Sequence, residues 1–151
     1  KFKIPAFGLI MHKTVLARFS RTLSTLLEGG IPIIQALESA GPTSGSMLLM
    51  EAVEKAARKI EEGKNIAEPL EESKLFPPMM IQMIAVGEET GDLSSLLDKV
   101  AGFYEEEVST MTKGLTTIIE PIMLIIVGLI VGVMLISLYL PIFTAITQSG
   151  I

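Results

Sequence analysis

The sequence contains no cysteine and a single histidine, His12. Disulfide bonds and thiolate metal sites are therefore excluded. His12 has no evident partner in the sequence, so a histidine-based metal cluster or catalytic triad cannot be assembled from this chain. A phosphate-binding glycine-rich loop is also missing, because residues 87–91 lack the lysine and the flanking strand that such a loop needs.

Charged residues are missing from the C-terminal part of the chain. All 12 basic and 17 acidic residues lie at or before Glu120, and the formal net charge is −5. Residues 121–142 would form a helix about 33 Å long, close to the roughly 30 Å hydrocarbon core of a bilayer. This run predicts one transmembrane helix rather than a buried core helix. The sequence has no basic stripe, which argues against a nucleic-acid partner.

The residues before this run have the periodicity of helices, and strand signals are weak. Apolar residues recur every three or four positions in residues 14–27, with Arg18 and Arg21 beside the apolar face. Residues 1–10 are expected to be an irregular or extended lead-in, because Pro5 and Gly8 interrupt the periodicity. Further helices are predicted from turn and capping residues: Pro32, Ser44 or Ser46, Asn65, Pro77-Pro78 and Asp92.

The last of these helices begins at Asp92 and keeps an apolar stripe for about five turns. No strong helix breaker separates this stripe from the uncharged run, so we expect one long helix that leaves the domain and enters the bilayer. Pro141 is expected to end or kink it. The predicted fold is all-α: a helical bundle of about six helices, the last running into a single C-terminal transmembrane helix.

One polar cluster, Glu88, Glu89 and Asp92, deserves weighing as a site. It lies at the end of one predicted helix, where the helix dipole disfavours anions. A cation from the first helix or a bound hard metal would compensate it, whereas the plain alternative is that Asp92 caps the next helix. A membrane-anchored enzyme that uses these three carboxylates is a distant alternative.

The uncharged run contains two glycines four residues apart, Gly128 and Gly132. This spacing places both on one face of a helix and lets a second helix approach closely. Glycines that are merely tolerated in lipid are the alternative. Lys99 and Lys113 precede the run and nothing basic follows it, so the positive-inside rule places the larger domain in the cytoplasm.

Six short motifs together resemble the PilC/GspF family of inner-membrane platform proteins, from type IV pilus assembly and type II secretion. They are LARFSRTLSTLL at 16–27, GGIPIIQAL at 29–37, FPP at 76–78, VGEETGDL at 86–93, Glu120-Pro121, and LPIF at 140–143. They follow the family's order and cover nearly the whole chain. Family members are similar in carrying two related helical cytoplasmic domains and three membrane helices, of which this chain resembles the second domain and the last helix.

The resemblance divides the chain into four parts. Residues 1–12 are a lead-in from a preceding membrane segment, 13–118 the cytoplasmic helical domain, 119–143 the transmembrane helix and 144–151 a short extracytoplasmic tail. The chain begins without Met, so we expect it to be a fragment of a longer protein.

The resemblance also implies a non-enzymatic role in the bacterial inner membrane. Family members contact a cytoplasmic assembly ATPase and help to move pilin subunits out of the bilayer; the equivalent role in type II secretion, with a pseudopilin, is the alternative. Other inner-membrane assembly proteins, a second copy of the chain and the lipid bilayer are the further expected partners.

No cofactor is expected to be required, but the resemblance raises the question of calcium. The family's first cytoplasmic domain is associated with a calcium site built from a Gln of the first hairpin and the Glu and Asp of the GExxGD loop. The matching positions are Gln35, Glu88 and Asp92, although this chain resembles the second domain.

Overall fold

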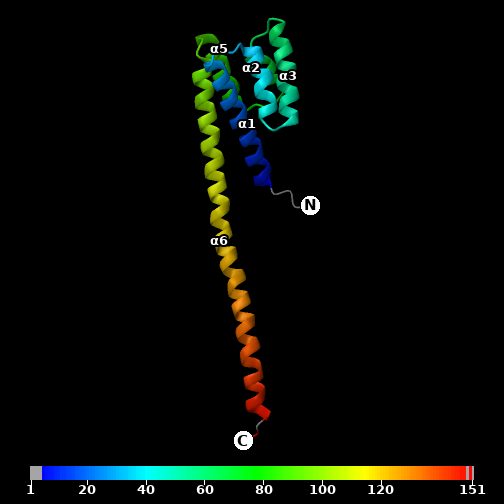
Figure 1. Ribbon diagram of the computed structural model, residues 1–151, viewed down its shortest axis with the longest axis vertical. Helices are drawn as coiled ribbons and strands as arrows, with labels where there is room; N and C mark the ends of the chain where they lie inside the picture. Colours follow the sequence, from blue (N-terminus) through cyan, green and yellow to red (C-terminus); the bar gives the residue numbers. More distant parts are fainter. Residues whose placement is uncertain (1–4, 149, 151) are drawn as a thin grey trace. The chain divides into compact units, whose positions relative to one another are not determined.

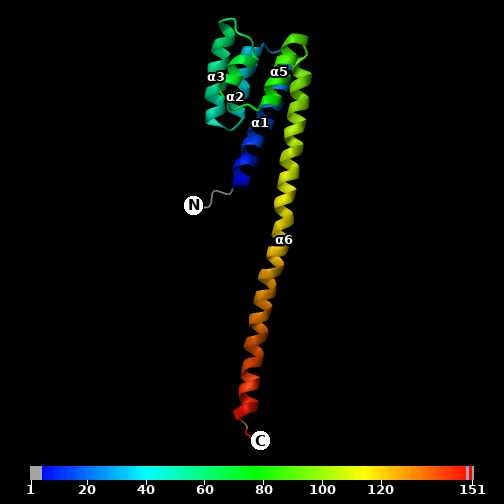
Figure 2. The same ribbon diagram turned by 180° about the vertical axis from the view of Figure 1, so that it is seen from behind.

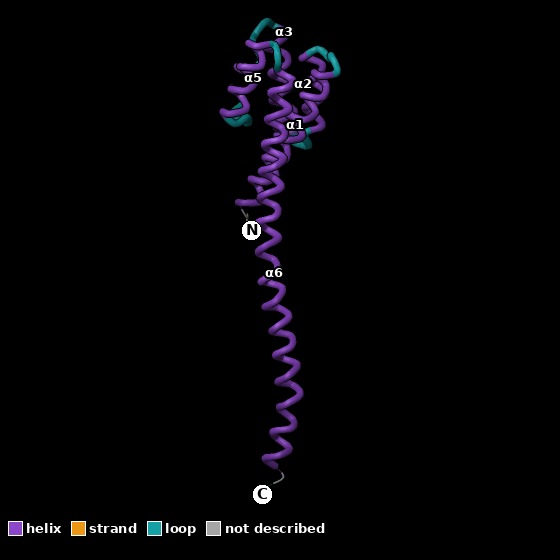
Figure 3. Tube along the Cα trace, turned by 90° about the vertical axis from the view of Figure 1, so that its left-hand side faces the viewer, coloured by secondary structure: helices purple, strands orange, loops and turns teal. Residues whose placement is uncertain are grey.

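The computed structural model of the protein describes residues 5–148 and 150. These residues form six helices and no strand (Figures 1 and 3). In chain order the helices are α1 Pro5–Glu28, α2 Ile33–Thr43, α3 Met47–Glu61, α4 Ala67–Glu72, α5 Pro78–Thr90 and α6 Leu93–Gln148. The predicted all-α class, with about six helices and a long last one, is confirmed.

The chain divides into two compact units, Lys1–Thr110 and Met111–Ile151. Helix α6 contributes its first five turns to the first unit and its remainder to the second. In the first unit, α2 packs against both α1 and α3 (Figure 2). Helix α4 contacts both α3 and α5.

The core of the first unit is built from the apolar faces that the periodicity predicts. Leu16, Phe19 and Leu23 of α1 are fully or almost fully buried, with exposed fractions of 0–1%. The ring of Phe19 lies 5.4 Å from the ring of Phe76, which directly precedes α5. Other buried core residues are Leu37, Leu49, Val53, Leu70, Met80, Ile84, Leu97 and Val100.

Most predicted helix boundaries are confirmed by local geometry. Ser46 caps α3, because its hydroxyl accepts a hydrogen bond from the Leu49 amide at 3.3 Å. Gly30 after α1 and Gly91 after α5 have φ angles of 80° and 74°, a region that glycine occupies at little steric cost. Each glycine therefore lets the chain reverse where the helix ends.

The expected irregular lead-in is wrong for the residues that the structure describes. Helix α1 begins at Pro5 rather than at Thr14, and residues 1–4 of the expected lead-in lie outside the described part. Proline fits the first turn of a helix, where its missing N–H has no partner to lose. Gly8 costs a helix only about 1 kcal/mol relative to alanine, so the helix continues through it.

The second unit consists of the rest of α6. The helix contains an 18-residue window with a mean hydropathy of 2.8 in which no residue is buried, and it is long and apolar enough to cross a membrane. Of the two alternatives for Pro141, the ending of the helix is wrong, since α6 includes Pro121 and Pro141 and ends at Gln148, and the kink stays a prediction. Each proline removes only one backbone hydrogen bond, and helices in apolar surroundings tolerate this.

Candidate functional site

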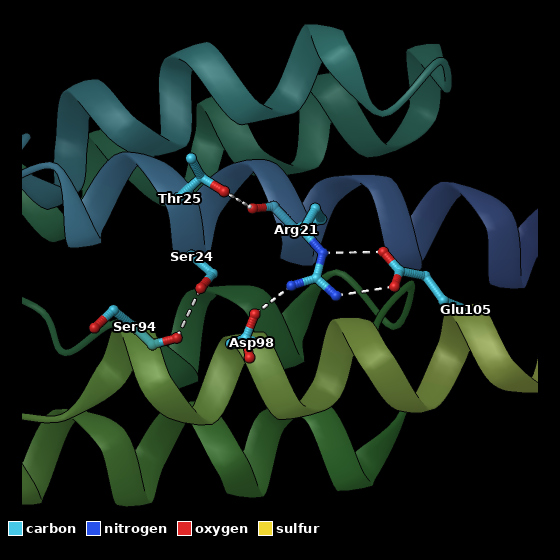
Figure 4. A network of polar contacts seen from close by, with 6 residues as sticks. All are labelled: Arg21, Ser24, Thr25, Ser94, Asp98 and Glu105. Atoms are coloured by element: carbon cyan, nitrogen blue, oxygen red, sulfur yellow. Dashed lines mark hydrogen bonds and ion pairs between the residues drawn. The ribbon is translucent and has the colours of Figure 1, made fainter.

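The start of helix α6 is fastened to helix α1 by a row of polar contacts within the first unit (Figure 4). We call this row the α1–α6 clasp. Its members are Lys13, Arg21 and Ser24 of α1, and Ser94, Asp98, Glu105 and Glu107 of α6. The row is the polar connection between the helical bundle and the helix that carries the uncharged segment.

Arg21 is the centre of the clasp. Its Nε donates to Glu105 Oε1 at 3.0 Å and its Nη2 donates to Glu105 Oε2 at 2.9 Å, the two-pronged geometry that a guanidinium prefers with a carboxylate. Its Nη1 also donates to Asp98 Oδ1. Asp98 and Glu105 are seven residues apart, so two turns of α6 bring both carboxylates to the face beside Arg21.

The two ends of the clasp set the register of α6 on α1. Near the end of α1, the Ser24 hydroxyl donates to the Ser94 carbonyl oxygen at 2.8 Å. Nearer its start, Lys13 Nζ lies 2.7 Å from Glu107 Oε2. Because residue numbers fall along α1 as they rise along α6, the two helices are antiparallel through this row.

The electrostatics of the clasp follow from these contacts. The hydrogen bond to Glu105 raises the pKa of Arg21 above its ordinary value, and the same bond lowers the pKa of Glu105. The side chains of Arg21, Glu105 and Asp98 are nevertheless 41%, 48% and 60% exposed. Water therefore screens the pairs, so the clasp contributes more to the register of the helices than to the free energy of unfolding.

Burial beneath the clasp holds the same turns of α6 in the core. Leu97, Val100 and Tyr104 are all under 5% exposed, and burial raises the pKa of Tyr104, with Glu107 adding to the shift. The contact between α5 and α6 requires Gly87, since a Cβ atom there would lie 2.8 Å from the Leu93 Cα atom. Apolar packing thus supplies stability and the clasp supplies alignment.

The three carboxylates of the acidic cluster have different surroundings. Both Glu88 carboxylate oxygens accept a hydrogen bond from the Ile66 amide, each at 2.9 Å, while Glu89 and Asp92 are exposed. The partner that the structure gives Glu88 is a backbone N–H just before α4, and compensation of the cluster by a cation stays a prediction. This bond satisfies one of the free amide groups at that helix start.

The calcium prediction concerns Gln35, Glu88 and Asp92. Gln35 is exposed on α2, and no group of three His, Asp or Glu side chains suited to a metal occurs in residues 5–148. Calcium takes six to eight oxygen ligands, more than two carboxylates and one amide supply without water or backbone oxygens. The calcium site stays a prediction.

The predicted helix contact concerns Gly128 and Gly132 in the second unit. A Cβ atom built on either glycine would meet no other atom within 4 Å beyond the local helix backbone. The space that a close helix neighbour needs is therefore present, and the contact itself stays a prediction.

The sequence reasoning missed the clasp, although it noted Arg21 beside the apolar face of its helix. The available signal was the seven-residue spacing of Asp98 and Glu105 next to the apolar stripe of α6. This spacing predicts that Asp98 and Glu105 share one face of the helix, but it does not predict which helix packs against that face.

Comparison of the sequence with known protein families finds one match that covers most of the chain. The family described as type II secretion system (T2SS), protein F, matches residues 19–141, a range that includes every clasp residue except Lys13 and most of the uncharged segment. The chain belongs to this family. The resemblance drawn from the short motifs is thereby confirmed.

The relatives of this chain carry names from two systems, type IV pilus assembly and type II secretion. A type IV pilus assembly protein PilC of Myxococcus xanthus is 45% identical over 141 residues, which are 93% of this chain and 34% of the relative. The PilC of Thermus thermophilus is 44% identical over 147 residues, 97% of this chain and 36% of the relative. A type II secretion system protein F of Pseudomonas aeruginosa is 34% identical over 142 residues, 94% and 35% respectively.

The chain spans about a third of the length of the curated relatives it matches. Its family is one of pilus and secretion assembly proteins, and its α6 has the length and composition of a membrane span. The chain thus belongs to a family of pilus and secretion assembly proteins and carries one candidate membrane span.

Proposed function

We propose that this chain is part of an inner-membrane platform of a type IV pilus assembly machine. The platform couples a cytoplasmic assembly ATPase to the movement of pilin out of the membrane. The observation that carries the proposal is helix α6, one helix that begins in the clasp and includes residues 121–142 of the uncharged run. A helix without an intervening loop transmits a displacement of the bundle to the segment in the bilayer.

The names of the relatives favour the pilus over secretion. PilC proteins of three organisms are 40–45% identical to this chain, whereas two type II secretion system proteins F are 30% and 34% identical. The secretion platform is the second candidate. Deleting the gene in its host separates the two: loss of surface pili supports the first role, and loss of a secreted protein with intact pili supports the second.

The platform has no catalytic activity of its own in this proposal. The polar side chains that the structure brings together in the clasp pair with one another and serve a mechanical role. Energy comes from the ATPase, and the bundle faces the cytoplasm, as Lys99 and Lys113 before the uncharged segment indicate. Replacing Glu88, Glu89 and Asp92 by alanine tests the enzymatic alternative, which requires a turnover that this change abolishes.

Within the bilayer, Gly128 and Gly132 form the contact with a second copy of the chain or with pilin. Small residues four apart let two helix backbones approach closely. Replacing both by leucine should weaken this contact without affecting membrane insertion. A disulfide cross-linking scan along α6, which has no natural cysteine, would identify the neighbouring helix.

The transmission of motion is tested by inserting Gly-Gly after Lys113 in the full-length protein. The insertion breaks the helix between the bundle and the uncharged segment, so we expect pilus assembly to be lost while membrane insertion persists. The control is the same insertion after Gly63, in the turn between α3 and α4. Surface pili are measured by shearing and immunoblotting, and normal piliation in the Lys113 variant would refute the mechanism.

A further inference from the structure

One charged residue lies within the apolar part of helix α6. In residues 114–151, Glu120 is the single Lys, Arg, His, Asp or Glu. Its side chain is exposed and has no ion-pair or hydrogen-bond partner among the described residues. The large apolar residues next to it are 50–60% exposed: Ile118, Ile119, Ile122 and Met123. An unpaired carboxylate is therefore surrounded by side chains suited to lipid.

The length of the apolar run places Glu120 at the edge of the hydrocarbon core. Residues 114–143 belong to α6 and form a helix about 45 Å long, against a bilayer of about 40–45 Å that includes roughly 30 Å of hydrocarbon. Glu120 lies about 9 Å from the start of this run, at the boundary between headgroups and hydrocarbon. A carboxylate is costly to leave unpaired at this depth, and such residues typically mark a binding site or pathway.

The turn before Glu120 offers hydrogen-bond acceptors, because both of its hydroxyl protons are already used. The Thr116 hydroxyl donates to the Thr112 carbonyl oxygen at 3.2 Å, and the Thr117 hydroxyl donates to the Lys113 carbonyl oxygen at 3.1 Å. Proline follows Glu120, so the Thr117 carbonyl oxygen lacks the helical N–H four residues on. Helical side chains point back toward the N-terminus, which brings the Glu120 carboxylate over this turn.

These acceptors select a compact cation. A protonated amine has three N–H groups that point in different directions, so it can donate to the Glu120 carboxylate and to the Thr117 carbonyl oxygen together. A guanidinium is a planar fork whose parallel N–H groups match the carboxylate alone. An anion would be repelled by Glu120. The ligand class that fits this turn is therefore a protonated amine.

The depth of Glu120 narrows the source of the amine. A second copy in the same orientation carries its nearest cation at Lys113, about 10 Å from the level of Glu120, and no Lys or Arg follows. A phosphatidylethanolamine headgroup carries a phosphate next to its amine, and Glu120 repels that phosphate. The source that fits is a different membrane protein, with a lysine or a terminal amine at the hydrocarbon boundary.

We infer that Glu120 binds the protonated amine of a partner membrane protein at the edge of the bilayer. The contact goes beyond the proposed function and does not depend on the transmission of motion. It gives the apolar run of α6 one polar contact, whose partner must present a cation at a set depth. Close packing at Gly128 and Gly132 cannot supply this selectivity, because small residues admit any helix that fits.

A membrane-permeant carbodiimide tests the contact in host membranes that contain the full-length protein. The reagent activates a carboxylate, and an amine nitrogen in contact then displaces the reagent as its urea and leaves an amide bond. We expect mass spectrometry to find Glu120 joined to an amine of a second protein. The matched control combines Ile119→Glu with Glu120→Gln, which keeps the carboxylate at the same depth on another face of α6. Its yield of this amide should be about tenfold lower.

Three results of this experiment would overturn the inference. Equal amide yields in the wild-type chain and the control indicate random encounters with amines. A product that carries one phosphatidylethanolamine and no protein assigns the site to lipid. Recovery of Glu120 only as the rearranged N-acylurea shows that no amine was in contact with the activated carboxylate.

Recovery of the cross-linked partner provides a second readout, by affinity purification without carbodiimide. We expect Glu120→Gln to lower the amount of that partner about tenfold at normal membrane levels, and Glu120→Asp to retain part of it. Equal recovery with wild type and Glu120→Gln would contradict the site. The Gly-Gly insertion after Lys113 leaves residues 114–151 unchanged, so the amide should still form in that variant. Failure of this site and failure of the transmission mechanism are thereby separated.

Discussion

Arg21 and Glu105, 84 residues apart in sequence, form a two-pronged ion pair with N–O distances of 3.0 and 2.9 Å. The pair joins the first helix of the bundle to the helix that carries the uncharged segment. Any displacement of α1 relative to α6 must therefore break or distort this ion pair.

Arg21→Gln should reduce the free energy of unfolding by about 1 kcal/mol, the upper end for partly exposed ion pairs, because two carboxylates lose their shared partner. Urea unfolding of the full chain in detergent, followed by far-ultraviolet circular dichroism, measures the change. Arg58→Gln removes an exposed pair within one helix and should leave the transition midpoint unmoved. If the two substitutions changed the free energy of unfolding equally, the clasp would stabilise the fold no more than an ordinary exposed ion pair.

The pKa of Glu105 should lie below its ordinary value of 4.5, because the hydrogen bond from Arg21 favours the charged carboxylate. Since folding depresses this pKa, the stabilisation is fully present above pH 4.5 and is lost as the pH falls through the lower folded value. A carboxyl-detected NMR titration of the full chain in nanodiscs measures it. In Arg21→Gln the pKa should return toward 4.5; an unchanged value would assign the shift to another cause.

Gly87→Ala should destabilise the bundle by about 1–3 kcal/mol through overpacking. The added methyl group would lie 2.8 Å from the Leu93 Cα and 2.9 Å from its Cδ1, at the tight connection of α5 and α6. Gly102→Ala is the matched control, because a methyl group there meets nothing within 4 Å. The control should stabilise α6 by about 0.5–1 kcal/mol through helix propensity. A destabilised control would contradict the packing argument.

Glu88→Ala should destabilise the start of α4 by about 1 kcal/mol, the usual cost of a lost helix cap, because the Ile66 amide loses its acceptor. Hydrogen exchange at the Ile66 amide should become faster. Glu89→Ala, a change at an exposed neighbour, should leave this exchange unaltered.

The same Glu88 variant tests the predicted calcium site at Gln35, Glu88 and Asp92. We propose that millimolar calcium raises the melting temperature of the wild-type chain and not that of Glu88→Ala. An unchanged wild-type melting temperature would leave Glu88 with its capping role alone.

The amino-acid sequence by itself determined most of the helices and the uncharged stretch that is long and apolar enough to cross a membrane. The apolar face of Leu16, Phe19 and Leu23, the Ser46 cap and the uncharged run after Glu120 are local signals, read within a few residues. Periodicity and capping act over one or two helical turns, so a linear pattern records them fully. The sequence was wrong where a local breaker was outweighed, at Pro5 with Gly8 and at Pro141, since neighbouring turns kept the helix intact.

Only the tertiary structure decided which charged groups meet. Arg21 was visible beside the apolar face, but its partners Asp98 and Glu105 lie 77 and 84 residues away, and no local pattern selects them. Glu88 likewise accepts a hydrogen bond from a backbone amide 22 residues earlier in the chain. These contacts depend on how buried faces pack, which brings distant polar residues together at the edges of the core. The packing of α1 on α6 therefore created the clasp.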